Sequence, residues 1–374
     1  MLNGIHLSLL IGPHVPVPAP QPVVEALTSV QVNSQRDRSG FQLTFTLGKT
    51  SLLQTVLLPA GFFDPIITRV VIVVTMNGMP HVLIDGIITR QEMSPSNEPG
   101  QSTLTITGED LTVLMDLDDM KISYPALPEF ARIGMILAKY ASFGIQPLVT
   151  PPTISPVPRP TNQIPMQTGT DLEYIRSIAT QCGYVFYIEP GPMPLTSIGY
   201  FGPDVRVRVP QPALSVNGDW DTNVESLSFS LDGLAKEITI ITVLDPVTHK
   251  IPLPIPVPNI SLLRPPLGAR LTPPAKIKIS DEMANLEPDE AAKRALGLMF
   301  NNTDAVSGNG SLSVVRYGHI LRSRMLVGVR GAGITYDGLY YVNSVTHNLK
   351  RGEYKQSFSL SRDGLISQTP VVLP

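Results

Sequence analysis

TDLEYIRSIATQCGYVFYIEP, residues 170–190, predicts a capped helix that passes directly into a strand. Thr170 and Glu173 have the spacing of a capping box, in which each side chain satisfies a free backbone N–H near the other residue. Gly183 follows the last apolar residue of the helical period, where a left-handed cap is expected. Aromatic and β-branched residues then fill positions 184–188, which indicates a buried strand. The apolar face of the predicted helix consists of Leu172, Ile175, Ile178, Ala179 and Cys182.

The composition is that of a globular protein. The 374 residues are 43% hydrophobic and 16% charged, and a chain of this length has room for more than one domain. A net charge of −3 gives no electrostatic reason to expect nucleic acid as a partner. The most apolar run, 66–76, contains Arg69 and is too short to cross a bilayer. Residues 1–10 lack the basic segment of a secretory signal, so we expect cytoplasmic assembly without membrane insertion.

No constellation of reactive side chains stands out in the sequence. The single cysteine, Cys182, excludes a cysteine metal site, and its place on the apolar helix face predicts an inert core thiol. The histidines never have zinc-ligand spacing, and His347 is expected to be a hydrogen-bonded structural residue of a strand. We therefore expect no catalytic residues, no cofactor and no metal.

Two weaker patterns have plain interpretations. Asp116, Asp118 and Asp119 resemble the start of a calcium loop, but the glycine and glutamate that such a loop requires are missing. Gly331-Ala-Gly333 follows a strand pattern, but no helix pattern follows it, which argues against a dinucleotide loop. We interpret them as a solvated acidic turn and a loop.

Residues 1–112 predict an arm followed by a β-domain. Prolines crowd positions 13–22 and predict an N-terminal arm (residues 1–22), either polyproline-like or an edge strand. Alternating patterns within 23–112 predict a small first β-barrel, and Asn77-Gly78 is a hairpin signal. The predicted strands are 23–32, 41–47, 70–75, 82–89 and 102–107.

Residues 113–205 predict a compact α/β insert. Pro128 precedes a helical pattern from Glu129 to about Phe143, and Gly144 follows as its stop. A proline-rich link connects this helix to residues 170–190. The inward face of the helix is expected to contain Phe130, Ile133, Ile136, Leu137 and Tyr140.

Strand patterns resume at 206–245 and 311–374, which predict a second β-barrel with an insertion at 246–310. The insertion contains Ile251-Pro-Leu-Pro-Ile-Pro-Val-Pro258, whose alternate prolines remove N–H donors from one edge of an extended chain. This run is either a wrapping arm with a protected edge or a solvated polyproline linker. Pro288 opens a helical pattern. Its expected inward residues are Ala292, Ala295, Leu296 and Met299, and the predicted strands are 224–231, 237–244, 311–315, 325–329, 339–345 and 355–360.

Two hairpin patterns in the sequence resemble each other. Residues 82–89 lead through a loop to 103–106 and an acidic turn before Leu111, and residues 339–346 lead similarly to 357–360 and Leu365. Either the same barrel occurs twice, or two generic hairpins match by chance. Two similar barrels in each of three chains around an axis would give a ring of six similar units. The predicted fold class is thus α+β and β-rich, with two similar small, tube-like β-barrels around an α/β insert.

The run at 170–190 resembles the middle of the late control protein D family, the hub proteins of contractile phage tails and related injection machines. Segments 39–45, 104–111, 324–330 and 337–347 also resemble family positions, and the chain is most similar to hubs of phage-tail-like contractile injection systems. The structural signature of this resemblance consists of Thr170, Asp171, Leu172, Glu173, Gly183, Tyr184, Phe186 and Tyr187.

The resemblance implies a structural baseplate hub rather than an enzyme. Such hubs are homotrimeric rings that adapt a sixfold inner tube to a threefold spike and line the central channel. The implied partners are a spike protein, an inner tube protein and other baseplate proteins, within an intracellular, membrane-anchored or released particle. Because the sequence ends soon after its last strand pattern, we expect the spike to be a separate protein.

Two functions from other classes remain open at this point. A tail-associated cell-wall hydrolase would use a pair of carboxylates, for which Glu225 and Asp219 are candidates, and Trp220 is the one tryptophan that could stack on a sugar. A surface adhesin would need export, and no export signal is found.

Overall fold

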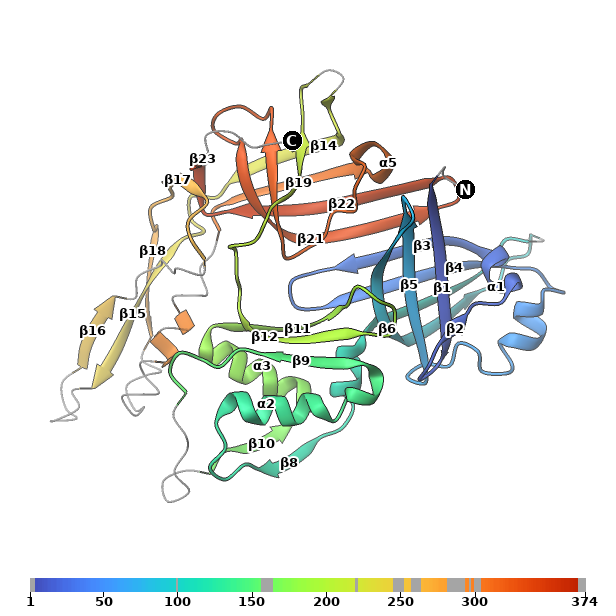
Figure 1. Cartoon of the computed structure of the whole chain (residues 1–374), viewed down its shortest axis with the longest axis horizontal. Coiled ribbons are helices and arrows are strands. Elements are labelled where there is room, and N and C mark those ends of the chain that lie inside the picture. The colour runs from blue at the N-terminus through green and yellow to red at the C-terminus, as the bar shows by residue number, and fades with distance from the viewer. Residues whose placement is uncertain are drawn as a thin grey trace.

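The computed structural model describes residues 4–98, 100–155, 164–218, 221–244, 252–256, 264–280, 293–295, 297–298 and 304–368. These residues form a β-rich α+β fold, as the sequence predicts, in which a large antiparallel sheet lies beside a smaller α/β unit (Figure 1). The main sheet has 13 strands, in the order β14-β19-β22-β21-β3-β4-β7-β6-β5-β1-β2, with β13 and β20 joined to it at the side.

The main sheet contains two groups of five strands from distant parts of the chain. The first group consists of β3 (Leu27–Ser34), β4 (Ser39–Leu47), β5 (Thr68–Met76), β6 (Met79–Ser94) and β7 (Ser102–Asp110). The second consists of β14 (Val224–Leu231), β19 (Val306–Ser313), β20 (Leu326–Arg330), β21 (Gly338–Lys350) and β22 (Glu353–Arg362). β13 (Gln211–Ser215) runs parallel to β20, and α5 (Val314–Tyr317) follows β19.

The two predicted barrels do not close among the described residues. The pairing runs as one open path from β14 to β2, and β21 joins β3 to make the two groups a single sheet. Apolar patterning could not distinguish these arrangements, because both a closed barrel and a continuous curved sheet bury one face of every strand.

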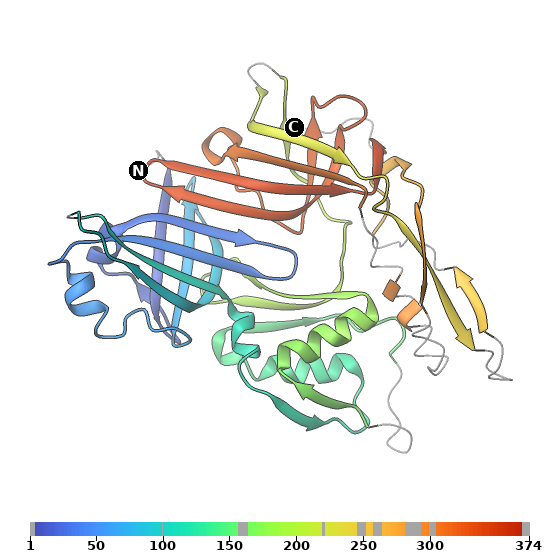
Figure 2. The ribbon, with the colours of Figure 1, turned by 180° about the vertical axis from the view of Figure 1, so that it is seen from behind.

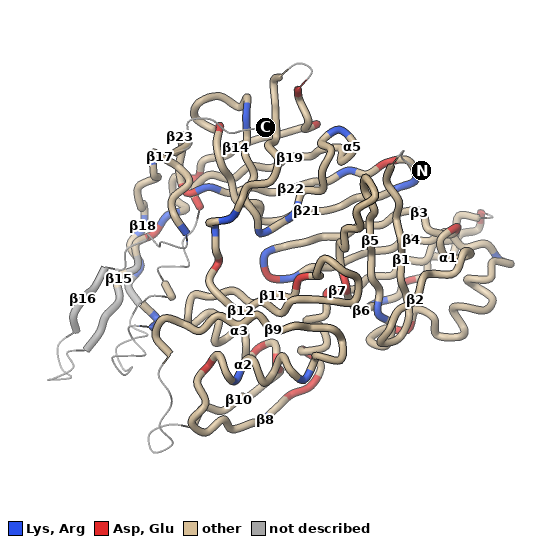
Figure 3. Tube along the Cα trace, in the orientation of Figure 1, with Lys and Arg blue, Asp and Glu red and all other residues tan. Residues whose placement is uncertain are grey.

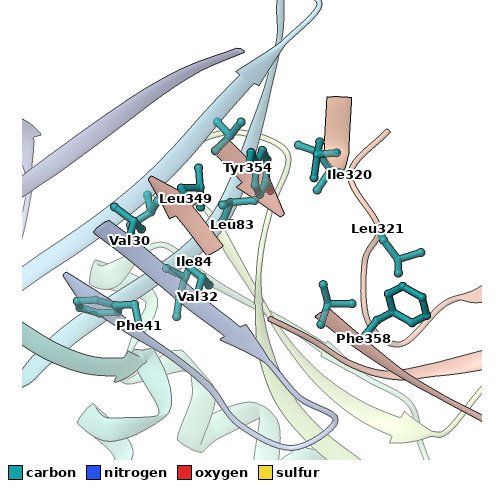
Figure 4. Close-up of a cluster of buried hydrophobic side chains, with 14 of the residues drawn as sticks. Val30, Val32, Phe41, Leu83, Ile84, Ile320, Leu321, Leu349, Tyr354 and Phe358 are labelled. Atoms are coloured by element: carbon teal, nitrogen blue, oxygen red, sulfur yellow. The ribbon is translucent and has the colours of Figure 1, made fainter. Parts of the chain in front are cut away.

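One core fills the space behind both groups. Residues of β3, β4, β6, β21 and β22 and of the loop before β20 pack together there (Figure 4). Val32, Leu43, Phe45 and Leu360 are almost fully buried. The two groups therefore share their hydrophobic stabilisation.

The N-terminal segment is part of the main sheet, and within the predicted arm the edge-strand alternative holds at Val17–Pro18. β1 (Ile5–Pro13) pairs along its length with β5, because its alternate residues bury apolar side chains such as Leu9 and Ile11. The chain reverses at His14, whose φ is 49°, and β2 (Val17–Pro18) returns along β1. Helix α1 (Gln21–Ala26) follows, so the strand predicted from position 23 begins at Leu27.

The Asn77-Gly78 turn forms the predicted hairpin. Both residues have positive φ, 51° and 80°, which is the backbone of a two-residue turn matched to strand twist. It joins β5 to β6, with Met76 opposite Met79.

Residues 111–203 form the α/β unit, whose helices lie between two small sheets (Figure 2). One sheet has the order β11-β12-β9 and the other pairs β10 with β8. The unit has its own core, formed mainly by the two helices and β11. Its elements are β8 (Met120–Ser123), α2 (Glu129–Ala138), β9 (Ile145–Val149), β10 (Met166–Gly169), α3 (Asp171–Cys182), β11 (Tyr184–Pro190) and β12 (Ser197–Pro203). The unit also contains two short helical segments, at Leu111–Met115 and Ala141–Phe143. A third short helical segment, at Leu53–Leu57, lies in the first strand group.

Helix α3 has both of its predicted caps. The Thr170 hydroxyl accepts from the Glu173 N–H, and the Glu173 carboxylate accepts from the Thr170 N–H, which completes the capping box. Gly183 has φ 67° and ends the helix. A Cβ at Gly183 would lie 2.3 Å from the Gly297 carbonyl oxygen, so close packing also requires glycine here. The five predicted apolar residues are all buried.

We expect Thr170→Ala to lower the free energy of unfolding by about 0.5–2 kcal/mol, the usual range for loss of an N-cap. The Thr170 hydroxyl also donates to Asp116 at 2.8 Å, so the effect should lie toward the upper end. Thr170→Ser keeps both bonds and is the control. Chemical denaturation measures the difference, and equal losses in both variants would show that the hydroxyl does not stabilise the helix.

Helix α2 is shorter than predicted. It ends at Ala138, a short helical segment follows, and Gly144 closes it with φ 81°. Ile133, Ile136 and Leu137 are buried as expected, but Phe130 is 37% exposed. Instead Glu129 is buried in an ion pair with Lys293, a contact between distant segments that helical periodicity cannot reveal.

The insertion in the second group forms a peripheral sheet with the order β16-β15-β18. β15 (Glu237–Leu244), which was assigned to the second barrel, pairs only with β16 (Pro252–Pro256) and β18 (Lys276–Ser280) among the described residues. The run 252–256 is therefore a strand paired on one side, the edge-strand alternative. β17 (Gly268–Leu271) pairs with β23 (Gly364–Ser367).

Part of this insertion lies outside the described residues. The two ends of the proline run, Ile251 and Pro258, belong to that part, and so do the predicted helix start at Pro288 and the inward residues Ala292, Leu296 and Met299. Residues 293–295 and 297–298 are described and helical. Among the described residues, no helix is long and apolar enough to span a membrane.

Candidate functional site

The two strand groups of the main sheet have the same topology. Each has its strands in the spatial order first, second, fifth, fourth, third, with every neighbouring pair antiparallel. β3 thus corresponds to β14, β4 to β19, β5 to β20, β6 to β21 and β7 to β22. The sequence echo therefore reflects a duplicated fold.

Two β-bulges in each group place the residues of the duplicated groups in register. The β3–β4 ladder skips Thr28, and the β14–β19 ladder skips Glu225. The β6–β7 ladder skips Thr89, and the β21–β22 ladder skips Asn343. With these bulges superimposed, the remaining ladder partners of both groups correspond.

The bulges correct the register of the sequence echo. Thr89 corresponds to Asn343, rather than to Thr346 as the aligned hairpin patterns predict. Alternation repeats every two residues and a bulge adds one, so the pattern alone leaves the register open. The hairpins themselves were matched correctly.

One face of the main sheet is covered by small polar side chains. Neighbouring serines bond across it, with Ser226 to Ser311 at 2.8 Å and Ser344 to Ser359 at 2.7 Å between their Oγ atoms. Two rows cross the strands, one of Ser226, Ser311, Ser357, Thr346 and Asn33 and one of Lys355, Asn348, Gln31, Gln42 and Thr107. We call this surface the polar face.

Several charges on the polar face lie in ion pairs. Lys355 Nζ lies 3.1 Å from Glu225 and 3.2 Å from Glu353, and Arg90 pairs with Glu92. Figure 3 shows that acidic and basic residues are scattered along the sheet rather than gathered in one patch. The face therefore offers hydroxyl and amide groups without a strong field of either sign.

The junction between the two groups is the antiparallel pair β21–β3. Val345 lies opposite Ser34, His347 opposite Val32, and Leu349 opposite Val30. These residues turn to the core, while Thr346, Asn348 and their partners Asn33 and Gln31 turn to the polar face. The Thr346 hydroxyl donates to Asn33 at 3.3 Å.

His347 is held neutral at this junction. Its Nδ1 lies 2.7 Å from the Tyr354 hydroxyl and 3.2 Å from Gln356 Nε2, and the ring is buried. Burial, with a smaller contribution from Arg322, lowers the pKa of His347 to about 3. The histidine is a structural residue, as predicted.

A buried charge cluster ties the segment that follows β12 to both strand groups. Arg206 Nη1 lies 2.9 Å from Asp304, Arg36 lies 3.3 Å from Asp204, and Tyr341 donates to Asp204 at 2.9 Å. Burial acts to raise the pKa of Asp304, but the neighbouring arginines outweigh it and hold the pKa below the usual value. The carboxylates here have structural partners.

The predicted signature residues lie in the α/β unit and at its border. Asp171 accepts from Lys139, Tyr140 and Gln167. Tyr187 is covered by Arg324, whose guanidinium lies 4.1 Å from its ring centroid. Leu172 and Phe186 are core residues, and Tyr184 donates to the Pro151 carbonyl at 3.2 Å. The structure thus groups these residues around α3, and their family meaning stays a prediction.

The residues with possible chemistry have structural surroundings. Cys182 is buried, which raises its pKa to about 12. Asp116 accepts from Thr170, while Asp118 and Asp119 are exposed in a turn. Glu225 pairs with Lys355, and Asp219 and Trp220 lie outside the described residues. In the part of the chain that the structure describes, no three His, Cys, Asp or Glu side chains form a metal-binding group.

The fold is similar to those of solved phage tail proteins. The tail protein from Neisseria meningitidis MC58 has a TM-score of 0.60 at 15% identity, with 97% of this chain and 98% of that chain covered. The 43 kDa tail protein of prophage MuSo2 from Shewanella oneidensis has a TM-score of 0.61 at 14% identity, with 96% and 99% covered. A chain of the Francisella PdpA–VgrG complex has a TM-score of 0.55 at 10% identity, with all of this chain and 55% of that chain covered.

These similarities establish the fold. The sequence matches no protein-family model and no curated protein sequence. The chain shares the fold of phage tail proteins over almost its whole length, and its membership of the late control protein D family stays a prediction.

Proposed function

We propose that this chain is a structural hub of a contractile phage tail or phage-tail-like injection system. Three copies would form a ring that adapts a sixfold inner tube to a threefold spike. The duplicated strand groups carry this proposal. Three chains with two matching groups each present six similar units to a tube and three whole chains to a spike. The similarity to phage tail proteins over almost the full chain supports it.

The polar face is suited to line the central channel of that ring. A passing protein or nucleic acid meets serine, threonine and asparagine side chains that are already solvated or bonded to each other. Several charges on the face lie in ion pairs, and acidic and basic residues are mixed along the sheet (Figure 3), so neither acidic nor basic cargo would be held by a long-range field. A lining of this kind binds its contents weakly.

The proposed partners are a spike, the first ring of an inner tube and other baseplate proteins. One protein with this fold belongs to a PdpA–VgrG complex, which supports a spike and baseplate setting. We propose a structural protein rather than an enzyme, because buried carboxylates such as Asp85, Asp204 and Asp304 are each engaged by arginine.

Imaging of assembled particles tests the hub proposal. We expect three copies of this chain between tube and spike, and deletion of its gene should leave other baseplate and tube components unassembled. Complementation with the intact gene is the control. Six copies in one ring, or normal tubes that carry a spike without this chain, would refute the proposal.

The hydrolase alternative has its own test. Purified chain in a peptidoglycan zymogram should give no clearing, with lysozyme as the positive control. Clearing that disappears on Glu225→Gln would favour the enzyme, because Glu225 is one of the carboxylates singled out in the sequence.

A further inference from the structure

The duplicated groups leave two strand edges that have no partner among the described residues. β6 is long, and its first part pairs with β5 through residues 79–87. Farther along, residues 90–94 pair with β7 on one side only within the described part of the chain. β14 lies at the end of the sheet, and its one partner among the described strands is β19. Exposed strand edges in a protein usually have a partner or a protecting feature.

The equivalent edges, one from each group, are paired with each other within the chain. β21 corresponds to β6, and its first part pairs with β20 just as β6 pairs with β5. The second part of β21, residues 345–350, pairs with β3. β3 corresponds to β14. The pairing of β21 with β3 inside one chain is therefore the template for a pairing of β6 with β14.

We infer that residues 91–94 of β6 pair antiparallel with β14 of a second copy of this chain. Six strands separate β14 from β6 in the sheet order, and the two do not pair with each other among the described residues, so we place their contact between chains. The contact is heterologous and continues from chain to chain until a ring closes. This inference rests on the proposed ring and specifies how its chains join.

The bulge alignment fixes the register of this contact. The template pair Thr346–Asn33 becomes Glu92–Ser230, and His347–Val32 becomes Met93–Phe229. By the same alignment, Val345–Ser34 becomes Gln91–Leu231 and Asn348–Gln31 becomes Ser94–Ser228. In the proposed contact, as in the template, polar side chains lie on one face of the paired strands and larger side chains lie on the other face.

The exposed side chains at the two edges fit this arrangement. Met93 is 44% exposed and Leu231 is 42% exposed, although both belong to strands of the main sheet. Phe229 is partly buried against Tyr336 and Tyr340. In the template, His347 and Val32, which correspond to Met93 and Phe229, are 4% and 0% exposed. Pairing with a second copy would cover Met93 in the same way and would place Leu231 opposite Gln91.

The polar rows also fit. Glu92 and Ser94 are exposed on β6, and Ser228 and Ser230 are exposed on β14. They would extend the polar face across the contact, as Thr346, Asn348, Asn33 and Gln31 do inside one chain. A second copy of this chain therefore suits the free strand edges on both faces of the sheet, the core face and the polar face.

Disulfide trapping in the full-length chain tests the register. Glu92→Cys with Ser230→Cys places two cysteines directly opposite each other on neighbouring strands. The distance between their Cα atoms would then lie within the range of about 4.4–6.8 Å that a disulfide needs. We expect covalent oligomers on oxidation, ending at a closed trimer. Cys182 stays in place because it is buried, and each single variant is a control.

A shifted pair is the matched control. Glu92→Cys with Ser226→Cys uses the same face of both strands, but the register separates these positions by four residues, roughly 13 Å. We expect little trapping from this pair. Efficient trapping by the shifted pair alone, or no trapping by Glu92→Cys with Ser230→Cys, would overturn the inference.

A charge at Met93 gives a second readout without thiols. Met93→Glu should weaken self-association at least tenfold in analytical ultracentrifugation, with an unchanged melting temperature. Met79→Glu alters another exposed methionine of β6 and should leave association unchanged. If particles contain three copies of the chain and Met93→Glu still assembles, the hub proposal survives and this contact fails. If particles contain no threefold ring, both fail.

Discussion

Arg69→Ala is expected to lower the free energy of unfolding by about 3–5 kcal/mol, the usual result of removing one partner from a buried ion pair. Arg69 and Asp85 are each 2% exposed. The guanidinium donates to both carboxylate oxygens of Asp85 at 2.7 Å. Burial raises the pKa of Asp85 even with Arg69 present, so the isolated carboxyl group would be costly in either form.

Arg69 also connects three parts of the chain. It donates to the His14 carbonyl at 3.1 Å, at the turn between β1 and β2, and to the Phe143 carbonyl at 2.8 Å in the α/β unit. Its loss would leave these part-buried carbonyls without a charged donor. We therefore expect the α/β unit to loosen from the main sheet in the same variant.

A matched surface pair provides the control for this prediction. Arg90 pairs with Glu92 on the exposed part of β6, and Arg90→Ala should cost less than about 1 kcal/mol. Arg69→Met with Asp85→Leu should recover part of the loss, because no charge is then left buried. Denaturant titration measures all variants, and equal effects of Arg69→Ala and Arg90→Ala would contradict the prediction.

Mild acid is expected to destabilise the fold through His347. The folded protein binds a proton at His347 only near pH 3, whereas the unfolded chain binds one below about pH 6.5. As the pH falls below about 6.5, the unfolded state takes up a proton that the folded state does not. Stability therefore decreases by up to about 1.4 kcal/mol per pH unit from this residue, which is about 2 kcal/mol between pH 7 and pH 5.

His347→Gln separates the contribution of His347 to acid sensitivity from the contributions of the other titrating groups. Glutamine stays neutral and can still bond to Tyr354, so the stability of the variant should change less between pH 7 and pH 5. His6 is exposed, and His6→Gln is the control variant. Denaturation at pH 7, 6 and 5 tests the difference. A His347→Gln slope equal to that of the wild type would show that His347 does not cause the acid sensitivity.

The sequence-based predictions that the structure confirms concern interactions between residues that are close together in the chain. The caps of α3 at Thr170 and Gly183 need only one turn of backbone. The hairpin at Asn77-Gly78 needs two residues that accept positive φ. The β4 strand follows from alternation between Phe41 and Leu47. Local backbone energetics and one-sided burial act within a few residues, so their signals are visible in the sequence.

The predictions that fail depend on which distant segments meet. Proline density at 13–22 did not indicate that residues 5–13 pair with β5. The place of β15 outside the main sheet, the burial of Glu129 beside Lys293 and the open sheet path all required the structure. Such contacts are set by which chain segments pack together, and a period of two or 3.6 carries no information on that choice.

The candidate site shows the same division. The amino-acid pattern alone indicates that two hairpins are alike and that serine and threonine alternate with apolar residues along them. The folded chain was needed to show that the groups share every strand neighbour, that bulges at Thr89 and Asn343 coincide, and that β6 and β14 keep free edges among the described residues. The reason is physical: alternation fixes which face of a strand is buried, whereas hydrogen bonds between strands far apart in the chain fix register and edges.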